Sequence, residues 1–161
     1  VEPGLVAEVA RILEETGVKG ERLNLEITES AVMERVDAVA EVLHELKRLG
    51  VQLHMDDFGT GLSSLSALHQ FPIDVLKIDR SFIVNMGQNR QFAAVVHAVL
   101  TLAREMGMRV IAEGVETPEQ LAQLLALGCD YIQGFHVSES LSPEQATALI
   151  GEGLRWARKA V

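Results

Sequence analysis

The chain has 161 residues, of which 48% are hydrophobic and 23% charged, and its formal net charge is −9. This length and composition suit a single domain with its own core. An acidic chain without a block of Lys or Arg is a poor candidate for binding long nucleic acid, because that affinity comes mostly from neutralised phosphates.

No apolar run approaches the roughly 18 residues that a membrane-spanning helix needs, so we expect no membrane segment. The single Cys129 cannot form an internal disulfide and fits a reducing compartment. We therefore expect a cytoplasmic protein.

Helices and strands alternate along the first half of the chain. Apolar residues recur at helical spacing over 5–17, and a short strand is predicted at Leu23–Thr28. A second amphipathic helix follows over Asp37–Leu49, and a second strand at Val51–Asp56. A glycine-rich loop then runs from Asp57 to Gly61.

The second half continues this alternation. The predicted elements are, in order, a short helix over 63–69, a strand at Val75–Asp79, a turn or short helix, a helix over 91–106, a strand at Arg109–Glu113, a helix over 117–128, a strand at Tyr131–Gln133 and a final helix from Ser142. Five strands alternating with helices predict an α/β fold with mostly parallel strands.

The faces of the strands distinguish an open sheet from a (β/α) barrel. One face of each strand is apolar, and the other carries polar residues, namely Asn24, Glu26, Gln52, His54, Asp56, Lys77, Asp79, Arg109, Glu113 and Gln133. A sheet buried on both sides would be apolar on both faces. Burying Glu26, Asp56 and Glu113 together costs several kcal/mol per ion unless positive charge lies among them. Scattered surface charges are the alternative. The polar residues fall on the same face of all five strands, however, and this favours a TIM-like barrel whose lumen gathers them.

The residue types indicate the chemistry of such a lumen. Carboxylates and an amide are hard oxygen donors that suit Mg²⁺ or Mn²⁺. Two such ions about 4 Å apart can activate water and stabilise the leaving oxygen in phosphodiester cleavage. Asp56 and Asp57 could reach two ions, and Lys77 could steady the attacking water or a phosphate oxygen.

Five motifs resemble those of the EAL domain in order and approximate spacing. They are Leu25-Glu26-Ile27-Thr28-Glu29, Asp56-Asp57-Phe58-Gly59-Thr60-Gly61, Leu76-Lys77-Ile78-Asp79, Ala112-Glu113-Gly114-Val115-Glu116 and Gln133-Gly134. The resemblance runs from about Pro3 to Leu141. It implies a phosphodiesterase that opens cyclic di-GMP to linear pGpG with two Mg²⁺ or Mn²⁺ ions.

The resemblance also implies roles for individual residues. Glu26, Asp56 and Glu113 match metal ligands, and Asp57 matches the ligand of the second ion. Lys77 matches the lysine that contacts the nucleophilic water, and Glu113 and Gln133 complete the catalytic group with it.

A further set of residues resembles the loop that borders this site. Glu29 matches a glutamate that holds the glycine loop in its working shape, and Glu116 matches a second glutamate at the site. The loop from Asp57 through Gly59, Thr60 and Gly61 to Ser64 resembles a segment that couples metal binding to dimer contacts. A homodimer through this segment is therefore expected, in a parent protein that carries cyclase-like or sensory domains.

Two departures from the family pattern bear on activity. The chain contains no Glu-Ala-Leu tripeptide, and about 80 to 90 residues of the usual barrel are absent. We therefore expect residues 1–161 to be an N-terminally truncated EAL domain, with about five of eight strands, that hydrolyses poorly by itself. Residues Phe135–Leu141 also replace a more usual pattern with a lysine-proline pair.

Two other functions compete with hydrolysis. A barrel of this kind could bind cyclic di-GMP as a receptor without cleaving it. Lys77 could instead act as the nucleophile of a Schiff-base lyase, which requires a depressed pKa in an apolar pocket. His54 is expected to make a structural hydrogen bond in the lumen.

Overall fold

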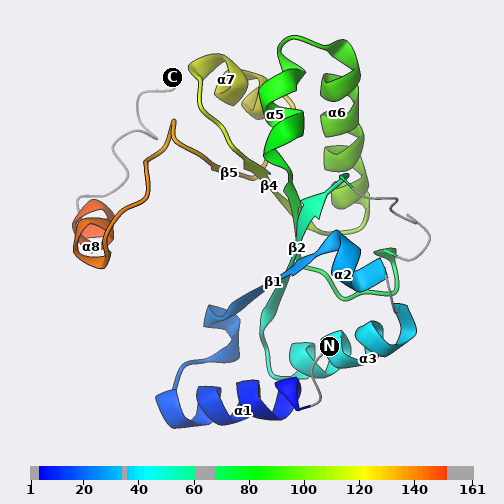
Figure 1. Cartoon of the computed structure of the whole chain (residues 1–161), viewed down its shortest axis with the longest axis vertical. Helices are drawn as coiled ribbons and strands as arrows, with labels where there is room; N and C mark the ends of the chain where they lie inside the picture. The colour runs from blue at the N-terminus through cyan, green and yellow to red at the C-terminus, as the bar shows by residue number, and fades with distance from the viewer. Residues whose placement is uncertain (1–3, 34–35, 61–67, 152–161) are drawn as a thin grey trace.

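The computed structural model describes residues 4–33, 36–60 and 68–151 (Figure 1). In chain order its elements are α1 (Leu5–Thr16), the 3₁₀ turn η1 (Gly20–Arg22), β1 (Asn24–Thr28), α2 (Glu29–Met33), α3 (Val36–Arg48), β2 (Gln52–Phe58), β3 (Val75–Ile78), α5 (Arg80–Met86), α6 (Arg90–Glu105), β4 (Arg109–Glu113), α7 (Pro118–Ala126), β5 (Tyr131–Gln133) and α8 (Pro143–Gly151). Within these ranges, no helix combines the length and apolar character that crossing a membrane requires.

The strands form one parallel sheet in the order β1-β2-β3-β4-β5. Helices α2, α3, α5 and α6 lie on one side of this sheet, whereas α8 stands out on the other (Figure 1). The sheet does not close on itself within the described residues, because β1 and β5 each pair with one neighbour only. The predicted α/β fold with an incomplete barrel of five strands is therefore confirmed.

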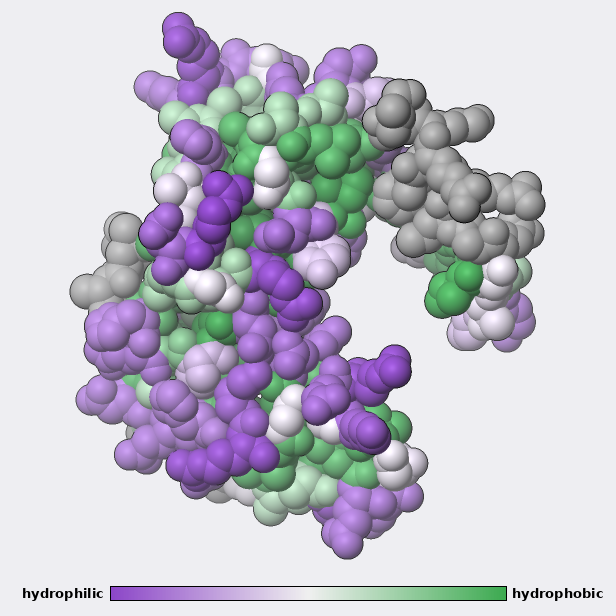
Figure 2. All heavy atoms as spheres, turned by 180° about the vertical axis from the view of Figure 1, so that it is seen from behind, coloured by the Kyte–Doolittle hydropathy of each residue, from purple (hydrophilic) through white to green (hydrophobic). Residues whose placement is uncertain are grey.

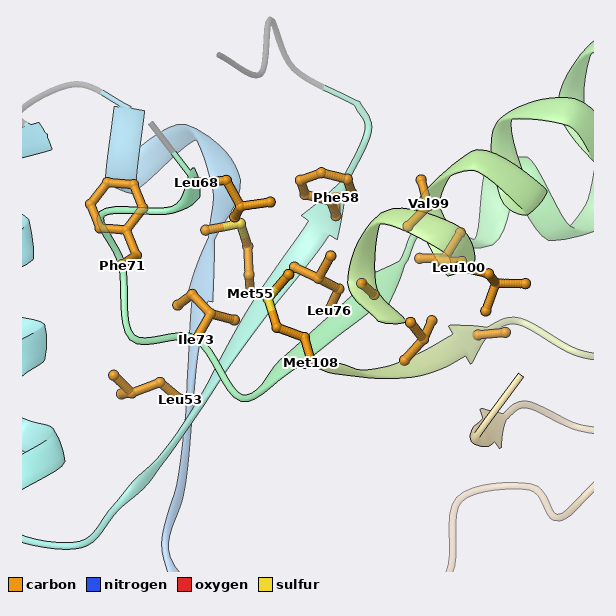
Figure 3. Packing of buried hydrophobic residues seen from close by; sticks show 14 of the residues in the cluster. Leu53, Met55, Phe58, Leu68, Phe71, Ile73, Leu76, Val99, Leu100 and Met108 are labelled. Carbon is orange, nitrogen blue, oxygen red and sulfur yellow. The ribbon is translucent and has the colours of Figure 1, made fainter. Parts of the chain in front are cut away.

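The core lies between the sheet and the helices on its covered side. Leu53, Met55 and Leu76 come from the strands and Leu100 from α6 (Figure 3). These four and Val96 of α6 are at most 3% exposed. Burying such a side chain contributes about 1.5–3 kcal/mol, so this layer fixes which face of each strand meets the helices. The opposite face is hollowed and lined by hydrophilic side chains (Figure 2).

The register of the sheet places the polar residues of neighbouring strands side by side. Glu26 lies beside His54, and Glu113 lies beside Gln133. Because all strands run in one direction, their carboxyl ends meet at one edge of the sheet. This alignment turns five separate polar faces into one continuous polar surface.

The elements differ from the predicted ones at two places. β2 does not end at Asp56 but continues to Phe58, with an irregularity in its pairing to β3 between Met55 and Phe58. Helix α2, which sequence analysis missed, begins directly after β1 and spans only 5 residues, too short for a periodic pattern. The helix predicted over 63–69 lies almost wholly outside the described residues.

Two aspartates that directly precede strands hold the strand register. Asp74 accepts the backbone N–H of Leu53 at 2.8 Å and also binds the ammonium of Lys47 at 2.8 Å. Asp130 accepts the backbone N–H of Val110 at 2.9 Å. Each aspartate thus connects the start of one strand to the second residue of the previous strand.

Replacing Asp74 by Ala is expected to lower the free energy of unfolding by about 1–3 kcal/mol, because a backbone donor and the Lys47 ammonium lose their partner. Urea denaturation followed by circular dichroism measures the change. Glu15→Ala removes an exposed ion pair with Arg11 on α1 and serves as the control, with an expected change within about 0.5 kcal/mol. Equal losses in the two variants would contradict this role of Asp74.

Candidate active site at the carboxyl ends of the strands

Three carboxylates from three strands converge on one ammonium group. The Nζ atom of Lys77 on β3 lies 2.9 Å from Glu26 on β1, 3.1 Å from Asp56 on β2 and 2.8 Å from Glu113 on β4. The side chain of Lys77 is 5% exposed, while that of Glu26 at the sheet edge is 51% exposed. The structure thus brings together four of the residues predicted to form the site.

The charges of this cluster do not balance. Burial alone lowers the pKa of Lys77, but hydrogen bonds to the three carboxylates outweigh it and raise the pKa above its ordinary value of 10.5. Lys77 is therefore a firmly held cation and not the depressed lysine that a Schiff-base lyase requires, which argues against that alternative. With three carboxylates around one ammonium, the cluster retains two uncompensated negative charges.

The backbone turns sharply at the aspartate pair. Asp57 has a φ of 55°, in the left-handed region that few residues other than glycine adopt. Its N–H donates to the carboxylate of Asp56 at 3.0 Å, so this carboxylate has a donor besides Lys77. The side chain of Asp57 is exposed and lies outside the Lys77 cluster.

Glu29 lies under the glycine-rich loop. Its carboxylate is almost fully buried and accepts the N–H of Gly59 at 2.8 Å. The Thr60 hydroxyl donates to the carbonyl of Asp57 at 2.9 Å, which tightens the same turn. This is a geometry that can hold the loop, and the role predicted for Glu29 stays a prediction. Gly61 lies outside the described residues.

A second group of predicted residues lies at the ends of β4 and β5. A hollow of about 350 Å³ is lined there by Arg80, Glu113, Gly114, Glu116, Gln133, Gly134 and Phe135. Gln133 lines it beside Glu113, whereas Glu116 lies outside the carboxylate cluster and pairs with Arg80 at 2.6 Å. Arg80 escaped sequence analysis, although its place directly after the third strand, at the edge where sites form, could have indicated it.

The prediction that His54 makes a structural hydrogen bond is wrong for the part of the chain that the structure describes. The side chain is buried on the polar face but makes no hydrogen bond there. Burial lowers the pKa of His54, and the nearby Glu26 carboxylate offsets this only in part. This shift favours the neutral form of the His54 ring.

The donor set fits a hard divalent cation in kind. Glu26, Asp56 and Glu113 supply only carboxylate oxygens, and the excess negative charge at the cluster would be offset by such an ion. Among the described residues, however, no group of three or more His, Cys, Asp and Glu side chains is arranged to hold a metal. The site as it stands would need further ligands or a rearrangement of these carboxylates around an ion.

Comparisons with known proteins found a matching family and similar solved structures. The family model of the EAL domain matches residues 1–140. The cyclic di-GMP phosphodiesterase NbdA of Pseudomonas aeruginosa is 43% identical over 137 residues, which cover 85% of this chain and 18% of NbdA. The chain spans about a fifth of the length of the curated relatives that it matches.

Two solved structures match the fold closely. The crystal structure of the EAL domain of Mycobacterium smegmatis DcpA is 41% identical with a TM-score of 0.89, over 96% of this chain and 69% of that one. The complex of Klebsiella pneumoniae BlrP1 with manganese and cyclic di-GMP is 33% identical with a TM-score of 0.80, over 86% of this chain and 35% of that one.

Replacing Lys77 by Met is expected to lower the free energy of unfolding at pH 7 by about 3 kcal/mol, the low end for a broken buried ion pair because Glu26 is half exposed. The folded pKa of Lys77 lies above the unfolded one. The stabilisation is therefore complete below the unfolded pKa and is lost as the pH rises through the folded pKa. Urea denaturation of wild type and variant at pH 7 and above pH 10.5 measures both effects.

The exposed Lys19 provides the matched control for this experiment, because Lys19→Met removes the same charge without a buried partner. If Lys77→Met and Lys19→Met change stability equally at pH 7, the cluster does not contribute to the fold as described.

Proposed function

The chain belongs to the EAL domain family, and we propose that, as part of a complete domain, it hydrolyses cyclic di-GMP to linear pGpG with the help of divalent metal ions. One observation carries the proposal, namely the convergence of Glu26, Asp56 and Glu113 on Lys77 at the carboxyl ends of parallel strands. Residues 1–161 would then be the C-terminal part of the domain, and the strands before Val1 would complete the barrel.

Two Mg²⁺ or Mn²⁺ ions are the proposed cofactors. Glu26, Asp56 and Glu113 would hold metal by their carboxylates, and Asp57 would reach the second ion from the turn at the end of β2. When bound, such ions supply a water of lowered pKa and offset the charge that develops on the phosphodiester. The complex of the relative BlrP1 with manganese and cyclic di-GMP supports this choice.

The side chains of this chain would orient the reactants. Water attacks phosphorus and the P–O3′ bond breaks, which leaves the 5′-phosphate of pGpG. The raised pKa of Lys77 keeps it protonated, but its three N–H groups face three carboxylates. Lys77 could donate to the attacking water or to a phosphate oxygen once one of these carboxylates turned toward a bound ion. Gln133, beside Glu113 in the sheet, can orient the same water. Glu29 holds Gly59 and so the turn that carries Asp57.

The wider setting of the domain belongs to the same proposal. Its substrate is a nucleotide messenger, so we place the domain in the cytoplasm. A homodimer would form through the segment after the aspartate pair, and cyclase-like or sensory domains would be attached in the parent protein. The relatives support the attached domains, since the chain matches only about a fifth of their length.

Cyclic di-GMP hydrolysis tests the proposed function. We expect a protein that extends this chain upstream by about 90 residues, enough to complete the barrel, to release pGpG in the presence of Mg²⁺ or Mn²⁺. Asp56→Asn removes a carboxylate from the cluster and should reduce turnover at least 100-fold, and EDTA should abolish it. The chain of 161 residues by itself should hydrolyse poorly. Chromatography of the nucleotide products measures pGpG release by the extended protein, by its Asp56→Asn variant, after EDTA and by the chain of 161 residues.

The outcome also separates the enzyme from a receptor. If the extended protein binds cyclic di-GMP but releases no pGpG with either metal, the domain is a receptor and the proposed hydrolysis is wrong. Glu45→Gln, on α3 and away from the cluster, is the control that should retain full turnover.

A further inference from the structure

We propose that Gly134 is a positioning residue for Gln133, because its missing side chain lets the turn after β4 close against the end of β5. The inference rests on the proposed function, in which Gln133 orients the attacking water beside Glu113. Glu113 and Gln133 are the last pair in the register of β4 and β5. The two turns that follow them therefore begin directly at the site.

The backbone of Val115 lies too close to Gly134 for any side chain to fit between them. A Cβ atom on Gly134 would lie 2.2 Å from the carbonyl oxygen of Val115 and 2.3 Å from its nitrogen. Atoms that are not bonded pack at about 3.5–4.0 Å. Because both neighbours are backbone atoms, no side-chain rotation can relieve the contact. A residue other than glycine at this position must therefore push the two turns apart.

Two backbone hydrogen bonds hold Val115 in this place. Its N–H donates to the carbonyl of Gln133 at 3.1 Å, and its carbonyl accepts the N–H of His136 at 2.9 Å. The side chain of Val115 is fully buried, which fixes the residue from within the fold. Gly134 lies between the two residues that Val115 bonds. We call this contact and its two hydrogen bonds the Val115–Gly134 junction.

The position of Gln133 depends on its backbone. The side chain of Gln133 is exposed and makes no hydrogen bond within the described parts of the chain. The carboxylate of Glu113, by contrast, is held by the ammonium of Lys77 at 2.8 Å. Gln133 therefore stays beside Glu113 only as long as the end of β5 stays against the turn after β4, which is what the Val115–Gly134 junction secures.

Of the two strands at the junction, β5 would give way first. It has 3 residues, pairs only with β4 among the described strands and lies at the end of the sheet (Figure 1). β4 has 5 residues and lies between β3 and β5. Its last residue, Glu113, is also anchored to Lys77. A side chain at position 134 would therefore displace Gln133 and leave Glu113 in place.

Such a displacement would affect turnover more than binding. The amide of Gln133 orients water only if it lies within hydrogen-bond distance of it, and an error on the order of 1 Å in such a group can cost about 100-fold in rate. Gly134 itself acts through Gln133. A Cβ atom on Gly134 would point at the backbone of Val115 and not into the space that substrate occupies.

Turnover of cyclic di-GMP by the extended protein tests this role. Gly134→Ala should lower kcat about tenfold or more and change KM less than about threefold. Gly107→Ala is the matched control, because Gly107 has a φ of 72° and nothing lies within 4 Å of its Cβ position. This control strains a turn without separating two strands, so its kcat should stay within about twofold of wild type.

A double-mutant cycle with Gln133→Ala separates positioning from a general loss of structure. If Gly134 acts through Gln133, Gly134→Ala should lower kcat less than about twofold once Gln133 is replaced. Losses that multiply in the double variant overturn the inference, and so does a wild-type kcat in Gly134→Ala. If Gly134→Ala does not fold, Val115→Ala loosens the junction from its buried side. It should lower kcat about threefold, with the same lack of additivity.

Amide signals of the same proteins give a result that does not depend on hydrolysis. In Gly134→Ala the N–H groups of Val115 and His136 should exchange with solvent about tenfold faster or more, and the side-chain amide resonance of Gln133 should shift. Gly107→Ala should change neither. If the extended wild type does not cleave cyclic di-GMP, the proposed hydrolysis is wrong, but these changes still support the placement of Gln133 by the junction. Unchanged signals overturn it.

Discussion

The ammonium of Lys77 holds three carboxylates that come from three different strands. In this arrangement β1, β2 and β4 run parallel to β3 and end at the same edge, so one cation connects four of the five strands. Because one ammonium cannot balance three carboxylates, the cluster retains negative charge at its open side. The same interaction thus connects the strands and leaves excess negative charge at their carboxyl ends.

Hydrogen bonds from carboxylate side chains hold the sheet that carries this cluster at both of its ends. Asp74 and Asp130 hold the starts of β3 and β5 to the preceding strands. At the other end of the sheet, Glu29 accepts the N–H of Gly59, directly after β2. The carboxyl edge therefore carries its polar groups on a fixed frame, while the edge at β1 remains open and leaves Glu26 half exposed. Strands placed beyond β1 in a complete barrel would cover that carboxylate.

Sequence alone predicted the five strands and placed Glu26, Asp56, Lys77 and Glu113 on one polar face, because alternation fixes which residues share a face. It did not predict that the three carboxylates converge on the Lys77 ammonium. It missed the extension of β2 through Asp57, since a positive φ in a residue other than glycine leaves no pattern in the sequence. It also missed the pairing of Glu116 with Arg80, which depends on how α5 and α7 meet the ends of β3 and β4. Such contacts follow from the tertiary fold and not from local spacing.

The central claim is that the carboxylates around Lys77 bind divalent metal in a complete domain. Crystals of the extended protein grown with Mn²⁺ and measured at an anomalous wavelength test it directly. The account predicts anomalous peaks within bonding distance of the carboxylates of Glu26, Asp56 and Glu113. An absence of peaks at these carboxylates at saturating Mn²⁺, in a domain whose barrel is complete, would contradict it.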